Sequence, residues 1–115
     1  MAIQNLEQKR LIFAMDNAKN DKAYGVMVKK VPAYIQTNGL LYTLSYLIEK
    51  DKAVFEGIQT WHTEAHNVLG FEAITKTDKT AFLKATFALT DDKVRFLTLE
   101  TLSLFKCLKR FVKDE

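Results

Sequence analysis

The stretch Asn38-Gly39-Leu40-Leu41-Tyr42-Thr43-Leu44-Ser45-Tyr46-Leu47-Ile48 decides the fold of this chain. Asn38 and Gly39 both tolerate the left-handed backbone conformation at which helices end, so the pair predicts the boundary between two helices. The residues from Leu40 to Ile48 are apolar on nearly every face. We expect a helix with this pattern to be buried at the centre of a helical domain.

Helices are also predicted on the amino-terminal side of this stretch. A first helix is expected over residues 5–20, and its inward positions are Leu6, Phe13 and Ala14. Asn20-Asp21 predicts a break and an N-cap for a second helix that ends near Lys30. Pro32 suits the first turn of a separate short helix, because its missing N–H costs nothing there.

Helical patterns continue on the carboxy-terminal side. Asp51 is expected to cap a helix whose apolar positions recur every three or four residues: Val54, Phe55, Ile58, Trp61, Ala65 and Val68. Residues 70–77 are expected to form a loop, in which 71–74 alternate as a short extended segment does. Asp78 is expected to cap a helix over 79–89, anchored by Phe82, Phe87 and Leu89. A last helix presents one broad apolar face: Val94, Leu97, Thr101, Leu104, Phe105, Leu108, Phe111 and Val112.

The length and composition are those of one globular domain. The chain has 115 residues, of which 48% are hydrophobic and 27% charged. With 4 Gly and 1 Pro it has too few turn-formers for a sandwich or barrel, and 1 Cys excludes an internal disulfide framework. No apolar run approaches the roughly 20 residues of a membrane span, and the polar start shows no secretory signal. We therefore expect a compact all-α bundle of about five to seven helices over residues 1–115, located in the cytoplasm.

Basic residues gather in the last helix. Residues 1–92 carry 11 basic and 11 acidic side chains, whereas residues 93–113 carry 6 basic side chains and Glu100 alone. In a helical projection a ridge lies within about 60°, formed by Arg95, Lys106, Arg110 and Lys113, with Lys109 adjacent. Such a ridge suits nucleic-acid phosphates, because each contact releases a counterion and positions the strand without reading its sequence. A merely solvated helix face is the alternative reading.

Residues with catalytic potential are few. His62 and His66 are four residues apart and could bind one metal ion. A zincin carries Glu directly after its first histidine, whereas Glu64 lies two residues after His62. No third ligand is evident, so we favour histidines at the surface or the edge of the core. Cys107 lies among Leu and Phe residues and favours packing. The chain also has four tyrosines that could stack bases but at helical spacing are more often core: Tyr24, Tyr34, Tyr42 and Tyr46. We expect neither a cofactor nor a metal nor enzyme activity.

Two motifs resemble those of a known family. Residues 31–47 combine a Pro before a helix, Asn-Gly-Leu and a Thr-Leu-Ser-Tyr-Leu helix, followed by Lys50. They resemble the small subunit of the Cmr complex, the type III-B CRISPR RNA-guided effector. A second match consists of Arg95, Thr98, Glu100, Leu102, Leu104, Leu108, Lys109, Arg110 and Phe111. Segments 9–14 and 23–32 also fit, residues 70–92 are not diagnostic, and Cys107 stands where the family is expected to carry Trp.

The resemblance implies a helical subunit without enzyme activity. Several copies stack against the backbone subunits that hold the guide RNA, and they line the channel in which target RNA pairs with it. Cleavage belongs to the backbone subunit. To the ridge, as the predicted RNA contact, we add secondary candidates that flank the first motif: Lys29, Lys30 and Lys50.

Three alternatives remain at this point. The chain could be a helical protein–protein interaction module without RNA binding, whose ridge pairs with an acidic partner. It could also be the small subunit of a type III-A complex, although the Asn-Gly-Leu and Lys-Arg-Phe motifs argue against that. A metal-dependent hydrolase using His62 and His66 is a remote third.

Overall fold

The computed structural model describes residues 5–71, 74 and 78–112. Within these residues the chain forms six α-helices, one π-helical turn and no strand. The elements are α1 (Leu6–Asn17), α2 (Lys22–Asn38), α3 (Leu40–Lys50), α4 (Lys52–Thr60), the π turn η1 (Trp61–Ala65), α5 (Lys79–Phe87) and α6 (Asp91–Leu108). The prediction of an all-α bundle with five to seven helices is therefore confirmed.

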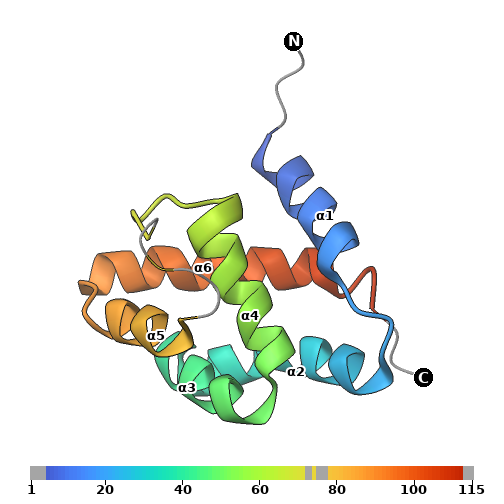
Figure 1. The fold of residues 1–115 in the computed structure, drawn as a ribbon, viewed down its shortest axis with the longest axis horizontal. Helices are drawn as coiled ribbons and strands as arrows, with labels where there is room; N and C mark the ends of the chain where they lie inside the picture. The colour runs from blue at the N-terminus through green and yellow to red at the C-terminus, as the bar shows by residue number, and fades with distance from the viewer. Residues whose placement is uncertain (1–4, 72–73, 75–77, 113–115) are drawn as a thin grey trace.

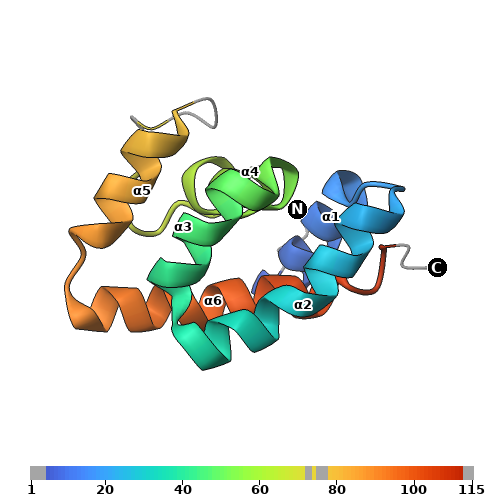
Figure 2. The same cartoon turned by 90° about the horizontal axis from the view of Figure 1, so that it is seen from below.

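The longest helix, α6, runs along the length of the molecule (Figure 1), and its main packing partners are α1 and α2. Helix α1 packs across the carboxy-terminal half of α6, and α2 lies beside α6 (Figure 2). Helix α3 packs against α2, α4 and α5. This arrangement places the middle of α2 next to the end of α6, although the two segments are far apart in the sequence.

Short polar residues begin four of the helices. The side chains of Asn5, Asp21, Asp51 and Asp78 each accept a hydrogen bond from the backbone N–H three residues further on, at 2.8 to 3.2 Å. These bonds satisfy donors that a helix start leaves open. The three predicted aspartate caps are thus confirmed. So is the boundary after Asn38, because Gly39 has a φ of 86° and donates its N–H to the Ile35 carbonyl at 2.8 Å.

The predicted break before Pro32 is wrong. Helix α2 continues through Pro32 as one helix of 17 residues. Val28, Val31 and Ile35 follow each other at spacings of three and four and are all buried on one side. Burial of this continuous stripe outweighs the single hydrogen bond that Pro32 cannot donate, since each such side chain contributes about 1.5–3 kcal/mol.

Helix α3 is not buried on all sides, so that prediction is wrong as well. Its inner face consists of Leu40, Thr43, Leu44 and Leu47. Tyr42, on the outer face, is 60% exposed. The neighbouring helices cover one side of α3, and the tyrosine hydroxyls tolerate water on the other side.

Several predicted anchors lie outside the core. Ala65 and Val68 are exposed, because α4 ends at Thr60 and the π turn changes the phase of the residues that follow. Phe87 is exposed because it lies about 140° around α5 from the buried Phe82. Phe111 is exposed and follows α6, which ends at Leu108. Half of the predicted extended segment over 71–74 lies outside the described residues, at 72 and 73.

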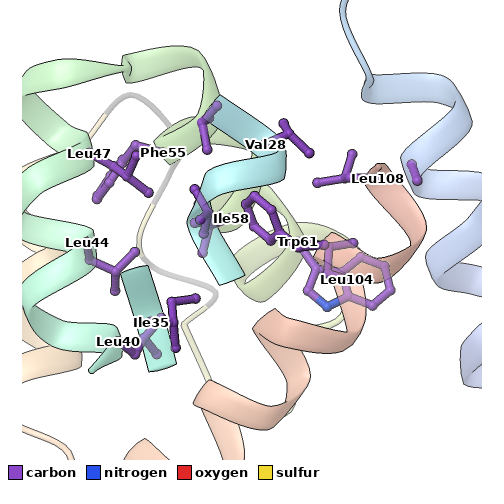
Figure 3. Close-up of a cluster of buried hydrophobic side chains, with 14 of the residues drawn as sticks. Val28, Ile35, Leu40, Leu44, Leu47, Phe55, Ile58, Trp61, Leu104 and Leu108 are labelled. Atoms are coloured by element: carbon purple, nitrogen blue, oxygen red, sulfur yellow. The ribbon is translucent and has the colours of Figure 1, made fainter. Parts of the chain in front are cut away.

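One hydrophobic core joins all the helices. Figure 3 shows side chains from α2, α3, α4, η1 and α6 that converge in it: Val28, Ile35, Leu40, Leu44, Leu47, Phe55, Ile58, Trp61, Leu104 and Leu108. Phe82 extends the core to α5, with its ring 5.9 Å from Phe55 and 5.5 Å from Phe71. This shared core fixes α2 and α6 relative to each other, and both helices carry basic residues on their outer sides.

Candidate nucleic-acid interface

Basic side chains from α2 and α6 meet in one hollow of the surface. It has a volume of about 520 Å³ and is lined by Lys29, Lys106, Lys109 and Arg110. All four residues are exposed, and among the described residues no acidic side chain lines the hollow. We call it the basic hollow. It unites three of the predicted ridge residues with Lys29, one of the secondary candidates.

The end of α6 explains why these cations lie together. Lys109 follows the last helical residue and donates its N–H to the Phe105 carbonyl at 3.0 Å, and Arg110 donates to the Cys107 carbonyl at 3.1 Å. Positive side chains are stabilised here by the negative end of the helix dipole. The packing of α2 against α6 adds Lys29.

The remaining predicted residues lie outside the basic hollow. Arg95 is exposed on α6, but it precedes Lys106 by 11 residues and so lies about 16 Å away along the axis. Lys30 and Lys50 are exposed on α2 and α3. Lys113 falls outside the described residues. The structure therefore divides the predicted ridge into a cluster at the end of α6 and an outlying arginine.

A second hollow lies between α1 and α6 and borders the basic hollow. Its volume is about 570 Å³, and its lining consists of Glu7, Arg10, Leu11, Ser103, Lys106, Cys107, Arg110 and Phe111. Lys106 and Arg110 line both hollows. The positive charge does not continue towards α1, because Glu7 and the Arg10 that pairs with Glu100 add no net positive charge there.

Glu100 does not neutralise the basic hollow, because it is turned into the core and is only 4% exposed. Its two carboxylate oxygens accept hydrogen bonds of 2.7 Å from Arg10, and Oε2 also accepts one of 3.0 Å from the Trp61 indole. Burial alone would raise the pKa of Glu100, but these hydrogen bonds hold the pKa below its ordinary value. The Glu100 charge is therefore balanced inside the molecule by Arg10.

His62 is a core residue, and its predicted place at the surface or the core edge is wrong. It is 1% exposed, and its Nε2 lies 2.9 Å from the Thr101 hydroxyl. That hydroxyl donates to the Leu97 carbonyl at 2.7 Å, so it accepts a hydrogen bond from the protonated Nε2 of His62. Burial lowers the pKa of His62 to about 3, which keeps the imidazole neutral.

The π turn separates the two histidines. His66 donates its N–H to the Trp61 carbonyl at 2.7 Å, five residues back, and its ring lies 5.2 Å from the Trp61 ring. His62 faces Thr101 instead. The described residues contain no cluster of three or more His, Cys, Asp or Glu side chains placed to hold a metal ion.

Cys107 and Tyr24 are buried as predicted. Burial raises the pKa of the Cys107 thiol, so the reactive thiolate is disfavoured. The prediction that tyrosines belong to the core is wrong for Tyr42. Tyr42 instead lines a third hollow, of about 210 Å³, together with Tyr34, Asn38, Thr43 and Tyr46. We call it the tyrosine hollow.

None of the helices in the described part of the chain is both long and apolar enough to cross a bilayer.

Comparisons with known proteins identify the family. No curated protein and no solved structure gave a significant match. The family model described as "CRISPR-associated protein (Cas_Cmr5)" matches residues 3–115, including the region 70–92 that the two sequence motifs leave undiagnosed. The chain therefore belongs to the Cas_Cmr5 family, the small-subunit family of type III-B CRISPR complexes.

Proposed function

We propose that this protein is a non-catalytic structural subunit of a type III-B Cmr complex and contacts the phosphates of the guide RNA–target RNA pair. Family membership gives the protein a place in a Cmr complex with other subunits. The observation that carries the RNA contact is the basic hollow, where α2, α6 and the two residues that follow α6 bring four exposed cations together. Each cation that meets a phosphate releases counterions, so binding is strong at low salt and independent of sequence.

The other predicted basic residues extend this contact. Arg95 lies further along α6 and reaches a more distant phosphate on the same RNA. Lys30 and Lys50 supply contacts on α2 and α3, and Lys113 adds one beyond the end of α6. In this proposal the residues position the RNA, while base pairing between guide and target supplies the sequence specificity.

Exposed apolar pairs supply the protein contacts of the same proposal. Phe96 and Leu99 are exposed three residues apart on α6, and Ile12 and Met15 are exposed three residues apart on α1. Exposed apolar patches of this kind mark protein interfaces. We assign them to the backbone subunits and to further copies of this chain, which stack in the cytoplasmic complex along the guide–target channel.

A non-catalytic role agrees with how the polar groups of the core are used. His62 is neutral and bonded to Thr101, and Glu100 is held by Arg10 and Trp61. These groups hold helices together and are not free to exchange protons with a substrate. We therefore propose that RNA cleavage takes place in another subunit.

The second candidate function is a protein-only interaction module. This function is supported as well as the first one by the exposed apolar side chains, because contacts through them do not require RNA: Phe96, Leu99, Ile12 and Met15. In that case the basic hollow binds an acidic protein surface. The two functions differ in whether the isolated chain binds RNA.

The test is a charge reversal in the basic hollow. The triple variant K106E/K109E/R110E is titrated with fluorescent single-stranded RNA over a range of salt concentrations. We expect weaker binding and a shallower dependence of log Kobs on log[salt], by about 2, because roughly 0.7 counterions are released per lost contact on a single strand. Circular dichroism is expected to remain helical, since all three side chains are exposed.

The matched control reverses three exposed lysines elsewhere. The variant K19E/K52E/K84E has the same net charge as the test variant, with its changes outside the basic hollow. It should retain most of the affinity and the salt dependence. Equal losses in both variants would attribute the binding to overall charge, and unchanged binding in the test variant would remove the RNA contact from this surface.

A further inference from the structure

The tyrosine hollow lies at the junction of α2 and α3 and has no role in the proposal above. Tyr34 and Asn38 come from α2, and Tyr42, Thr43 and Tyr46 come from α3. The rings of Tyr34 and Tyr46 are 5.5 Å apart with an interplanar angle of 77°. This edge-to-face pair holds both rings in fixed orientations. The hollow is therefore a preformed aromatic site at the surface.

The lining suits one flat, polar-edged group. Three aromatic rings offer stacking faces, and the exposed side chain of Asn38 can both donate and accept hydrogen bonds. Burial and the neighbouring Tyr34 raise the pKa of Tyr46, so its hydroxyl stays protonated and neutral. A volume of about 210 Å³ is below the roughly 300–1,000 Å³ of pockets that hold drug-sized ligands, so the hollow fits one ring system.

Tyr42 is the outermost ring of the site. It is 60% exposed, although it belongs to a helix whose other face forms the core. A large aromatic side chain left in water retains stacking surface that the fold itself does not use. Tyr42 is therefore available to cover a ring that enters the hollow.

Charged side chains of both signs flank the tyrosine hollow, and the acidic one is Glu49, which is exposed and follows Tyr46 by three residues on α3. Lys30 precedes Tyr34 by four residues on α2, and Lys50 follows Tyr46 by four residues on α3, so each lies one turn away on the same side of its helix. Both lysines are exposed. Aromatic rings between cations are the combination by which proteins hold single-stranded nucleic acid.

The tyrosine hollow and the basic hollow lie on different sides of α2, and Lys30 lies between them around the helix. Lys29 lines the basic hollow, Lys30 is the next residue, and Tyr34 and Asn38 line the tyrosine hollow. Tyr34 and Asn38 lie about 8 to 14 Å from Lys29 along the helix axis and about 140° and 180° around it, so a strand that reaches both hollows passes around α2.

We propose that the tyrosine hollow is a stacking site for an unpaired nucleobase of RNA whose phosphates cross α2 from the basic hollow. The inference rests on the proposed function, because it takes the same RNA as its ligand. In this arrangement the base inserts among Tyr34, Tyr42 and Tyr46, and Asn38 bonds to its edge. Lys30 and Lys50 contact the phosphates on either side. Stacking accepts any base, so the site adds affinity without sequence preference.

The experiment compares two RNAs of the same length, a mixed-sequence single strand and its abasic counterpart, binding to the full-length chain at low salt. Wild type is expected to bind the base-bearing RNA about five-fold or more tightly than the abasic RNA. Tyr42→Ala should abolish this preference, because it removes the outer stacking face. Tyr42→Phe should keep the preference, since it keeps the ring.

Two matched variants separate stacking from other effects. Phe87→Ala removes another exposed ring, 50% exposed, at the end of α5 and outside the lining of the tyrosine hollow, and should leave the preference intact. The triple variant K106E/K109E/R110E should weaken binding of both RNAs to a similar degree, because both carry phosphates.

The outcomes also separate this inference from the proposed function. If wild type binds both RNAs equally while the triple variant binds neither, the stacking site is overturned and the phosphate contact stands. If Tyr42→Ala leaves the preference unchanged but weakens association with the other Cmr subunits, the hollow is a protein-docking site and the inference is wrong. If wild type binds neither RNA, the proposed function fails first and the stacking site with it.

Discussion

Buried polar side chains in this protein find partners that are far away in the chain. Arg10 pairs with Glu100 across 90 residues, and His62 pairs with Thr101 across 39. No spacing between neighbouring residues in the sequence predicts either pair. The sequence therefore shows that these residues are polar, but it cannot show that they are core residues joining three elements.

His62 makes the stability of the fold depend on pH. Its pKa is lowered to about 3, whereas the unfolded chain has the ordinary value of 6.5. As the pH falls below about 6.5, His62 binds a proton in the unfolded state but stays neutral in the folded state. We expect the free energy of unfolding to fall by up to about 1.4 kcal/mol per pH unit in this range. Urea denaturation at pH values from 7.5 to 5, about half a pH unit apart, measures this change in the free energy of unfolding.

The two histidines provide a comparison for this pH dependence. His62→Gln offers Thr101 an amide N–H in place of the imidazole N–H and removes the titrating group. The free energy of unfolding of this variant should therefore change little between pH 7 and 5. His66→Gln should retain the wild-type slope, because the buried imidazole is still present. Equal slopes in the two variants would contradict the assignment to His62.

At the scale of helices, local chemistry predicts boundaries better than burial. The caps at Asp21, Asp51 and Asp78 and the stop at Gly39 were predicted correctly, because each depends on a side chain and the few residues next to it. The continuation through Pro32 and the exposed face of α3 depend on which neighbours cover each side. Those neighbours are fixed only when the helices pack.

Two glycines should respond in opposite ways to replacement by alanine. Gly39 has a φ of 86°, and no atom lies within 4 Å of the position that a Cβ would take, so Gly39→Ala is opposed only by the backbone conformation. We expect it to lower the free energy of unfolding by about 1–2 kcal/mol. Gly57 lies inside α4, also with space for a Cβ, and Gly57→Ala should raise that free energy by about 0.5–1 kcal/mol.

Chemical denaturation of both variants measures these changes. Because neither alanine meets a neighbouring atom, the difference in sign reports the backbone alone. A stabilising Gly39→Ala would mean that the turn between α2 and α3 does not need its left-handed residue.

At the scale of the whole molecule, α1 is joined to the bundle mainly through α6. The Arg10–Glu100–Trp61 bonds and the Phe13 ring, 5.1 Å from the Trp61 ring, form this junction. Glu100→Gln removes the charge that Arg10 needs. We expect a loss of about 2–3 kcal/mol, less than for a fully buried pair because Arg10 keeps some contact with water.

Hydrogen exchange distinguishes loosening of α1 from general instability. In Glu100→Gln the α1 amides should exchange faster than they do in wild type. The exchange rates of the α3 amides should change little, because α3 does not contact the Arg10–Glu100 pair. Glu7→Gln makes the same change at an exposed site on α1 and serves as the control. A uniform acceleration over all helices would contradict the role of Arg10 and Glu100 as a junction.

The candidate interface could be predicted only in part from the sequence. Lys106, Lys109 and Arg110 were predicted because they lie close together at the end of one helix. Lys29 was named only as a neighbour of the first motif, and its place opposite these three residues results from the packing of α2 on α6. The tyrosine hollow was missed, because helical spacing does not show which side of α3 remains uncovered.

The two ends of α6 differ in net charge, because Lys93 and Arg95 offset the two aspartates at its start. Asp91 and Asp92 lie in its first turn, and Lys106, Lys109 and Arg110 lie at its other end, about 25 Å away. The surplus of positive charge at the far end makes the charge distribution uneven along the longest helix. An approaching polyanion would turn the molecule before they touch, so that the basic end meets it first. Salt would then slow the encounter as well as loosen the complex, and most collisions at low ionic strength would begin in the productive orientation.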